Sequence, residues 1–267
     1  RIEYACAVDM RFGGIEPVGA LSESQSKRNG ICLRLTRRGR HGPFVKAEVI
    51  NPKGRPAMVR DLLNYDFLPS WLQGAMGFES TSARGRESVD MAVSYDGDEA
   101  VEITAHDRNG RITMRIHYDR ALETNAARSV RARFLNMRSY DYAMPSGASH
   151  AEFQRDTQGR DVRVTFFNSA GKPARNGEGV FGYAMKRNAA GRVETVVNTD
   201  ENGRPMPNLR GVTQVHLRWN DRGQPVHSRF ADAGDHPAMF NGIAGAEVAY
   251  DEAGNVTAIR RLDADGN

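Results

Sequence analysis

Turn signals recur along the second half of the chain with a fixed period. Four tetrapeptides begin with Asp or Asn and end with Gly, and successive copies are 32, 32 and 31 residues apart: Asp156–Gly159, Asn188–Gly191, Asn220–Gly223 and Asp251–Gly254. Asp or Asn at the first position of a type I turn accepts hydrogen bonds from the backbone ahead of it, and Gly at the end adopts the left-handed conformation. The period therefore predicts evenly spaced β-turns.

Three further marks share this period. A second set of turns begins twelve residues after the first, a lone glycine recurs between turns, and a proline follows three of the second turns: Asn168, Asp200, Asp232 and Asp263; Gly147, Gly179, Gly211 and Gly242; Pro173, Pro205 and Pro237. We therefore predict tandem structural repeats of about 32 residues. Residues 125–128 align as an earlier, degraded copy. Arg128 and Asp235 stand where Gly is expected, so we expect those turns to be strained or differently shaped.

The residues between the turns alternate between apolar and polar. Apolar side chains occupy every second position of the flanking stretches, for example Val162, Val164 and Phe166, and polar residues such as Arg163 take most of the other positions. Period two over a run of this length indicates a strand with one buried face. We therefore predict a mainly β fold, in which tandem antiparallel β-hairpin repeats form an extended twisted meander.

The first half of the chain uses the same turn residues without the period. Turns are predicted at Asn51–Gly54 and Asp107–Gly110, next to stretches that alternate as strands do. The segment 58–76 is apolar at mixed spacing, which indicates short helices inserted in this half. We therefore divide the chain into an irregular β-hairpin region, 1–124, and a regular β-hairpin repeat array, 125–267.

Charge and hydropathy argue against several kinds of partner. Basic residues outnumber acidic ones by only 37 to 33 and do not cluster, so there is no strong nucleic-acid signal. No apolar stretch reaches the roughly 18–20 residues that span a bilayer, so no transmembrane segment is expected. Cys6 and Cys32 could form one disulfide in an exported protein or remain two buried thiols. We favour an extracytoplasmic location, periplasmic or secreted, and the start at Arg1 without Met suggests a trimmed or processed chain.

The last turn of the first set carries a family resemblance. The run from Tyr250 to Thr257 (YDEAGNVT) resembles the YD repeat of RHS-type bacterial proteins, with looser matches at Trp219–Gly223 and Lys186–Gly191. The 125–267 region is also similar to repeat arrays appended to bacterial signalling or defence proteins, and this second resemblance fits the period better. The first implies a shell of spiralling antiparallel sheet, and the second implies an appended sensing or interaction region. Neither transfers a catalytic residue.

Residues that could carry chemistry stand singly. Ser146 and His150 are the best candidates for a hydrolase, but no G-x-S-x-G turn surrounds the serine. His216 and His227 could come close across a hairpin, yet no third ligand stands at a recognisable zinc-site spacing. Residues 263–267 resemble the start of a calcium loop, which the repeat turn also explains. We therefore predict no catalytic residue, no metal site and no cofactor.

Linear arrays of repeats present extended surfaces, which suit macromolecules better than small molecules. We therefore expect a non-enzymatic module for macromolecular recognition, or for structural packing within a larger bacterial protein. The partner would be a protein, a polysaccharide or another domain of the same polypeptide, bound by an exposed face that carries Arg163, Arg192 and Arg218. The alternatives are an extracytoplasmic sensor, with a small-ligand pocket where the region 58–100 meets the sheet, and the hydrolase around Ser146.

Overall fold

The structure, a computed structural model, describes residues 1–11, 13–28, 32–56, 90–107, 109–119, 122–124, 127–135, 147–240, 242–252 and 254–267. Within these residues the protein is mainly β and antiparallel, as predicted, with 17 strands in one sheet. The first elements are β1 (Ile2–Arg11), β2 (Gly14–Leu21), α1 (Glu23–Arg28), β3 (Cys32–Arg37), β4 (Phe44–Ile50), β5 (Asp90–Asp96), β6 (Glu99–His106), β7 (Ile112–Tyr118), β8 (Leu122–Thr124) and β9 (Ala127–Leu135). The others are β10 (His150–Arg155), β11 (Asp161–Phe167), β12 (Gly182–Arg187), β13 (Val193–Thr199), β14 (Gln214–Trp219), β15 (Pro225–Ala231), β16 (Gly245–Tyr250) and β17 (Val256–Leu262). The predicted helical segment 58–76 lies outside the described residues.

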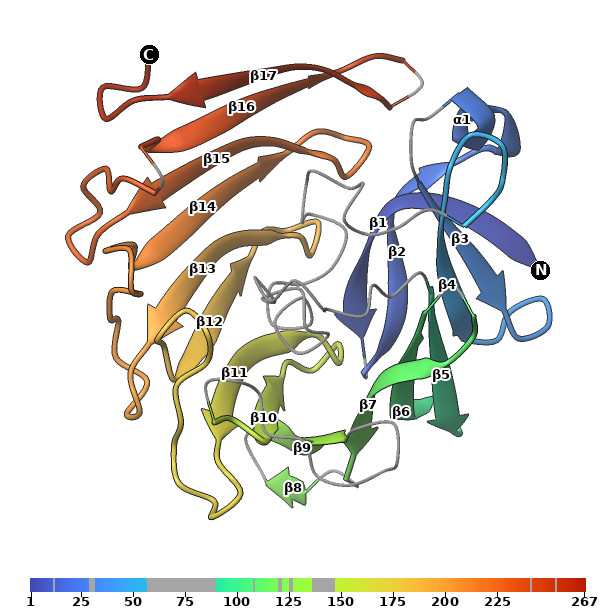
Figure 1. The fold of residues 1–267 in the computed structure, drawn as a ribbon, viewed down its shortest axis with the longest axis horizontal. Helices are drawn as coiled ribbons and strands as arrows, with labels where there is room; N and C mark the ends of the chain where they lie inside the picture. Colours follow the sequence, from blue (N-terminus) through green and yellow to red (C-terminus); the bar gives the residue numbers. More distant parts are fainter. Residues whose placement is uncertain are drawn as a thin grey trace.

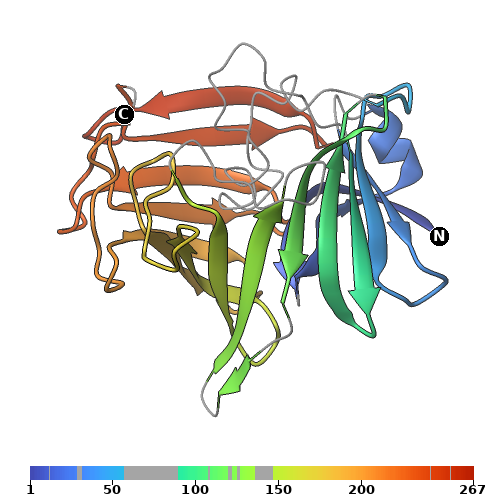
Figure 2. The ribbon, with the colours of Figure 1, turned by 60° about the horizontal axis from the view of Figure 1, so that its bottom comes forward.

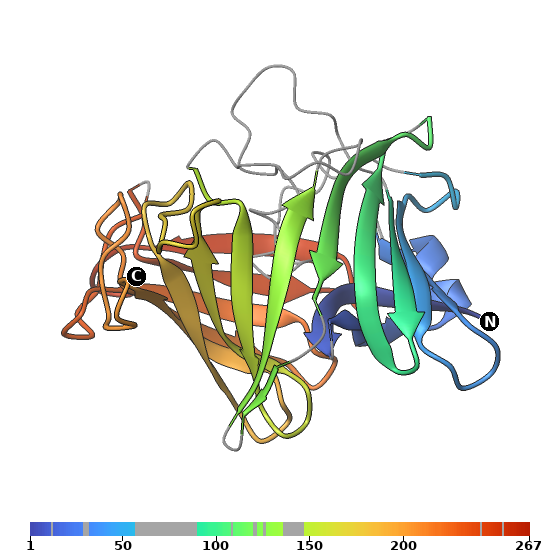
Figure 3. The same ribbon diagram turned by 90° about the horizontal axis from the view of Figure 1, so that it is seen from below.

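The strands follow one another almost in chain order. They pair as β2-β1-β3-β4-β5-β6-β7-β9-β10, and from β10 to β17 each strand pairs with the next one in the chain. The short strand β8 pairs with the start of β9. Figure 3 shows the strands from β5 to β12 side by side in one layer, so the sheet continues from the irregular half into the repeat array.

The sheet curves until its two ends approach each other. In Figure 1, β1 to β7 lie on the right, β9 and β10 at the bottom, and β11 to β17 on the left. Near the ends, the side-chain amide of Asn255 donates a hydrogen bond of 2.9 Å to the carbonyl of Arg28. A Cβ on Gly223, in the β14–β15 turn, would lie 3.0 Å from the backbone nitrogen of Gly19 in β2. The turns of the C-terminal hairpins, stacked in Figure 2, therefore lie against β2 and the end of α1.

The turns of the first set are closed by their own Asp or Asn residues. The carbonyl of Asp156 accepts the N–H of Gly159 at 3.0 Å, and its carboxylate accepts the N–H groups of Gln158 and Arg160, both at 2.9 Å. The other three turns close in the same way, with N–H to carbonyl distances of 2.8, 2.9 and 3.0 Å at Asn188, Asn220 and Asp251. The glycines have positive φ, as this turn requires. Local turn chemistry thus places every hairpin of the array.

The two turn positions without glycine behave differently. Asp235 has a φ of 63°, close to the 72° of Gly171 at the equivalent position, so its turn has the same backbone shape as the glycine turns. A residue other than glycine is strained at this positive φ, as the sequence predicted. The Asp235 carboxylate accepts a hydrogen bond of 2.6 Å from Arg229, which offsets part of that strain. Arg128 does not lie in a turn, because it is paired with Glu123 inside the β8–β9 hairpin.

One face of the sheet carries a continuous apolar stripe. Directly paired residues share a face, so the stripe passes from Val130 to Phe153, then to Val164 and to Tyr183. All four side chains are buried. On the same face Phe166 packs edge-on against Tyr183, with the ring centroids 5.9 Å apart. The core of the protein is therefore one surface of the sheet, shared by both halves of the chain.

The stripe weakens towards the C-terminus. Phe166 is buried, but the residues at its equivalent repeat positions are Asn198, Phe230 and Arg261, the last of which is exposed. In β17 only Leu262 is buried. The final hairpin therefore contributes little to the core.

The residue immediately before each later turn joins one repeat to the preceding one. Its side chain donates a hydrogen bond to the carbonyl of the first residue of an earlier strand: Arg187 to Asp161, 3.1 Å; Trp219 to Val193, 2.6 Å; Tyr250 to Pro225, 2.8 Å. Three different side chains thus serve one geometric role, and the Tyr of the YD-like run is one of them.

A second contact links each turn to the next. A Cβ on Gly191 would overlap the guanidinium of Arg160, and a Cβ on Gly223 would lie 3.2 Å from a guanidinium nitrogen of Arg192. At the following step the amide of Gln224 donates to the carbonyl of Gly254 at 3.2 Å. The first residue after each turn therefore packs on the glycine of the next turn.

We expect Gly191→Ala to cost more stability than Gly211→Ala. Both glycines have positive φ, 78° and 83°, which costs an alanine about 1–2 kcal/mol. Nothing lies within 4 Å of a Cβ on Gly211, whereas a Cβ on Gly191 displaces the Arg160 guanidinium, at a further cost of about 1 kcal/mol. Urea denaturation of the two variants measures the difference. Equal losses would mean that Arg160 does not restrain the turn.

Candidate functional site

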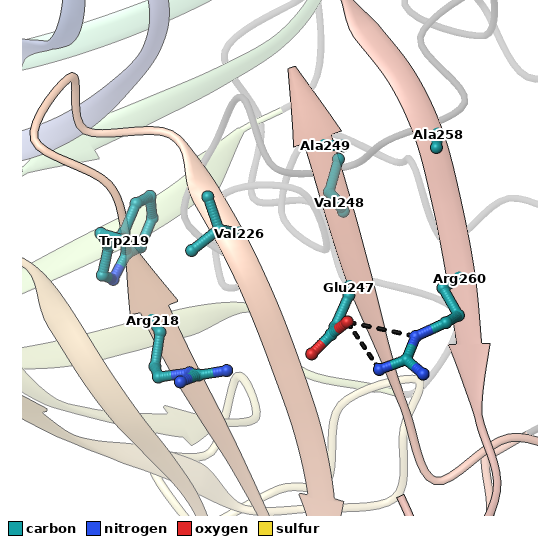
Figure 4. Close-up of a pocket in the computed structure, with 8 residues that line it drawn as sticks. All are labelled: Arg218, Trp219, Val226, Glu247, Val248, Ala249, Ala258 and Arg260. Carbon is teal, nitrogen blue, oxygen red and sulfur yellow. Dashed lines mark hydrogen bonds and ion pairs between the residues drawn. The ribbon is translucent and has the colours of Figure 1, made fainter. Parts of the chain in front are cut away.

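A surface depression of about 520 Å³ lies on the face of the sheet opposite the apolar stripe, across the last four strands. Figure 4 shows its lining: Arg218, Trp219, Val226, Glu247, Val248, Ala249, Ala258 and Arg260. We call these residues the β14–β17 site. It combines an aromatic ring, small apolar side chains and charged groups, which is the composition of surfaces that bind other molecules.

Strand register places the charged groups of the site in a row. Arg218 in β14 is directly opposite His227 in β15, His227 is opposite Glu247 in β16, and Glu247 is opposite Arg260 in β17. Residues directly opposite each other in a sheet point to the same face. The row therefore contains two guanidinium groups, one carboxylate and one imidazole on a single surface.

Trp219 forms the fixed wall of the site. Its indole N–H donates to the carbonyl of Val193 at 2.6 Å, so the polar edge of the ring is bound inside the array. The β14–β15 pairing shifts register between Arg218 and Trp219, and this bulge directs the two neighbouring side chains differently. An aromatic ring held in this way loses little freedom when it binds a partner.

The charges of the site are only partly neutralised. Arg260 donates two hydrogen bonds to Glu247, of 2.8 and 3.2 Å, and this contact holds the pKa of the Glu247 carboxyl below its usual value. No carboxylate of the described residues forms an ion pair with Arg218, which is exposed. Burial lowers the pKa of His227, and the positive charge of Arg218 lowers it further. The site therefore keeps a surplus of positive charge.

The outer face of the N-terminal half differs in this respect. Arg34 contacts Glu48, Lys46 lies between Glu48 and Asp90, and Asp90 contacts the ring of His106 at 2.6 Å. Each charge there faces an opposite one on a neighbouring strand. Such a surface is satisfied internally and offers a charged ligand less than the β14–β17 site does.

Arg218→Gln is expected to raise the pKa of His227 towards its ordinary value. Burial is the larger cause of the depressed pKa and remains in the variant, whereas the repulsion from the Arg218 guanidinium is removed. An NMR titration of the imidazole measures the change. Lys186→Gln, at the equivalent position one repeat earlier, is the control and should leave the pKa of His227 unchanged. An unchanged pKa in Arg218→Gln would contradict the described row.

The three arginines of the predicted binding face have different surroundings. Arg218 is exposed in the β14–β17 site. Arg163 is half-buried, and a Cβ on Gly203 would overlap its guanidinium. Arg192 is half-buried as well and packs at the Gly223 turn. Of the three, only Arg218 is exposed, and the role of all three in binding stays a prediction.

The residues considered for catalysis and metal binding are also placed. Ser146 lies outside the described residues, and His150 stacks on Phe167, with the ring centroids 5.3 Å apart. His216 bonds to Asp235 at 2.9 Å. In the described part of the chain no three His, Cys, Asp or Glu side chains are grouped as a metal site would need. The Asp263 carboxylate accepts the N–H groups of Asp265 and Asn267, at 2.9 and 3.0 Å, which is a repeat turn.

Two other sequence expectations have limited structural counterparts. The sensor pocket was expected where 58–100 meets the sheet, and most of that region lies outside the described residues. Cys32 is buried, and the side chain of Cys6 lies outside them as well. The described residues include no helix long and apolar enough to cross a membrane.

The sequence analysis missed Trp219, Glu247 and Arg260 as site residues. A signal was present for Trp219, because an aromatic or arginine side chain with a donor precedes every turn of the first set: Arg155, Arg187, Trp219 and Tyr250. Their shared position in the repeat indicates a shared structural role. Glu247 and Arg260 become neighbours only through the β16–β17 register, which the alternation pattern alone does not fix.

Comparison with known proteins adds no relative. The sequence matches no protein-family model and no curated protein.

Proposed function

We propose that this chain is a non-enzymatic recognition module of a larger bacterial protein, and that its β14–β17 site binds a protein partner through an acidic side chain or a chain-terminal carboxylate. The observation that carries the proposal is the exposed guanidinium of Arg218, without an ion pair among the described residues, beside the fixed ring of Trp219. The proposed module agrees with the resemblance to repeat arrays appended to bacterial proteins.

The chemistry of the site favours a carboxylate. A guanidinium presents paired N–H donors whose spacing matches the two oxygens of a carboxylate. Glu247 is occupied by Arg260, so it repels an incoming carboxylate less than an unpaired acid would. Val226, Ala249 and Ala258 are small enough to leave room for an apolar side chain next to the charge. A short peptide segment that combines an acidic and an apolar residue satisfies both parts of the site.

Selection from a phage-displayed library of random peptides tests the proposal. We expect the full chain to enrich peptides that contain Asp or Glu next to an apolar residue. These peptides should bind Arg218→Glu at least about tenfold more weakly, because the guanidinium is replaced by a repelling charge. Fluorescence anisotropy with the selected peptides measures the affinities.

Lys186→Glu is the matched control. Lys186 is exposed and occupies the position of Arg218 one repeat earlier, but it does not line the site. The control should bind the selected peptides as the unchanged chain does. Equal binding by Arg218→Glu, or enrichment of peptides without acidic residues, would contradict the proposal. Binding of neutral oligosaccharides that is lost on Arg218→Glu would replace the protein partner by a polysaccharide.

A further inference from the structure

The outer edge of β17 has the backbone geometry that three other strands of this chain use to bind a neighbour. β11, β13 and β15 each receive the first strand of the next hairpin along one edge, and each pairing contains three residue pairs: Arg163 with Ala184, Val164 with Tyr183 and Thr165 with Gly182; Thr195 with His216, Val196 with Val215 and Val197 with Gln214; His227 with Glu247, Ser228 with Ala246 and Arg229 with Gly245. The same three repeat positions of β11, β13 and β15 therefore pair with the same three repeat positions of the next strand.

The hydrogen bonds at this edge are repeated as well. The N–H groups of Phe166, Asn198 and Phe230 donate to carbonyls of the entering chain, at 2.8, 2.8 and 2.7 Å. The equivalent residue of β17 is Arg261, so its N–H points to the outer edge. Backbone groups alternate in direction along an antiparallel strand, so the N–H of Ile259 points the same way.

In the described part of the chain, β17 pairs with β16 alone. The side chains of residues 256–261 are exposed, including 41 % of Val256 and 52 % of Ile259. An edge strand with unpaired backbone groups and exposed β-branched residues is a template for another strand. Ile259 occupies the repeat position of Val164, which its neighbours bury completely.

We propose that the outer edge of β17 is a strand-addition site, and that its occupant is the first strand of a hairpin repeat of this same type, added antiparallel. The three internal pairings specify the occupant, because they show which strand this edge geometry accepts and in which register. In the repeat register, Ala258, Ile259 and Arg260 would face the counterparts of His216, Val215 and Gln214. The interaction uses the backbone edge of β17, whereas the β14–β17 site uses the side chains of Ala258 and Arg260 on one face of that strand.

The test uses a synthetic peptide with the sequence of residues 210–233, which contains the β14–β15 hairpin, added to the full chain. We expect amide hydrogen exchange at Ile259 and Arg261, followed by NMR, to slow at least about tenfold at saturating peptide. Exchange at Arg260, whose N–H points towards β16, is the internal control and should be unaffected.

Two modified reagents separate backbone pairing from other binding. A peptide N-methylated at the residue corresponding to Val215 lacks one edge hydrogen bond and should lose the protection. Arg261→Pro removes the outer N–H and should abolish binding, whereas Arg261→Ala retains that N–H and should bind normally. The N-methylated peptide needs no change in the protein, so it decides the question even if Arg261→Pro fails to fold.

The outcomes are distinct. No slowing at Ile259 and Arg261, or equal slowing with the N-methylated peptide, would overturn strand addition. Binding that is lost in Arg218→Glu without protection at Arg261 would place the peptide on the charged face, which also overturns it. Protection that persists in Arg218→Glu would support it independently of the proposed function.

Discussion

Asp161→Ala is expected to lower the free energy of unfolding by about 3–5 kcal/mol, because it leaves the Arg155 guanidinium buried without its counter-charge. The two side chains are 2 % and 3 % exposed, and Arg155 donates a hydrogen bond of 3.0 Å to the Asp161 carboxylate. The guanidinium also lies 5.6 Å from the ring centroid of Tyr118. Burial raises the pKa of the Tyr118 hydroxyl, which indicates that this region is shielded from solvent. Little water reaches this region to replace the lost carboxylate. Urea denaturation measures the change.

The double variant Arg155→Met with Asp161→Leu is the control for that prediction. It removes both charges and keeps the volume apolar, so it should lose much less stability than Asp161→Ala or even gain some. A loss below about 1 kcal/mol in the single variant would mean that Arg155 finds another partner or reaches solvent. A double variant as unstable as the single one would assign the cost to packing instead of charge.

Phe166→Ala is expected to lower the free energy of unfolding by about 3–5 kcal/mol as well, for a different reason. The side chain is 2 % exposed and packs edge-on against Tyr183 at the centre of the apolar stripe. Its removal leaves a cavity between strands that are fixed by their backbone pairing and cannot close around it. The midpoint of urea denaturation should fall accordingly.

Arg261→Ala is the matched control, because Arg261 occupies the position of Phe166 three repeats later and is exposed. We expect its effect to stay within about 0.5 kcal/mol. Similar losses for the two variants would show that the last hairpin contributes to the core as much as the first one. That result would contradict the weakening of the stripe towards β17.

The sequence predicted the hairpin array because its determinants are local. Asp156 and Gly159 set their turn within four residues, and Val164 and Phe166 identify the buried face by their alternation alone. These signals act within one hairpin and need no knowledge of the rest of the chain. The mainly β, antiparallel architecture followed directly from them.

Long-range features were not predictable in the same way. The curvature that brings Asn255 to Arg28 accumulates from the twist of many strands, each contributing a small rotation that residue type does not reveal. The β14–β17 site depends on register across four strands, and the bond from Trp219 to Val193 joins two neighbouring repeats through the β13–β14 pairing. Arg163 and Arg192 illustrate the difference, because both were expected on an exposed face, whereas packing against turn glycines half-buries them.

The hydrogen bonds from the residue before each turn have a polarity that affects how such an array can evolve. The later hairpin supplies the donor, and the earlier one supplies a main-chain oxygen, which every amino acid possesses. Asp161, Val193 and Pro225 therefore serve equally well as acceptors despite their unlike side chains. A unit with a hydrogen-bond donor before its turn can therefore form this bond with any preceding unit, whatever side chain that unit carries at the acceptor position.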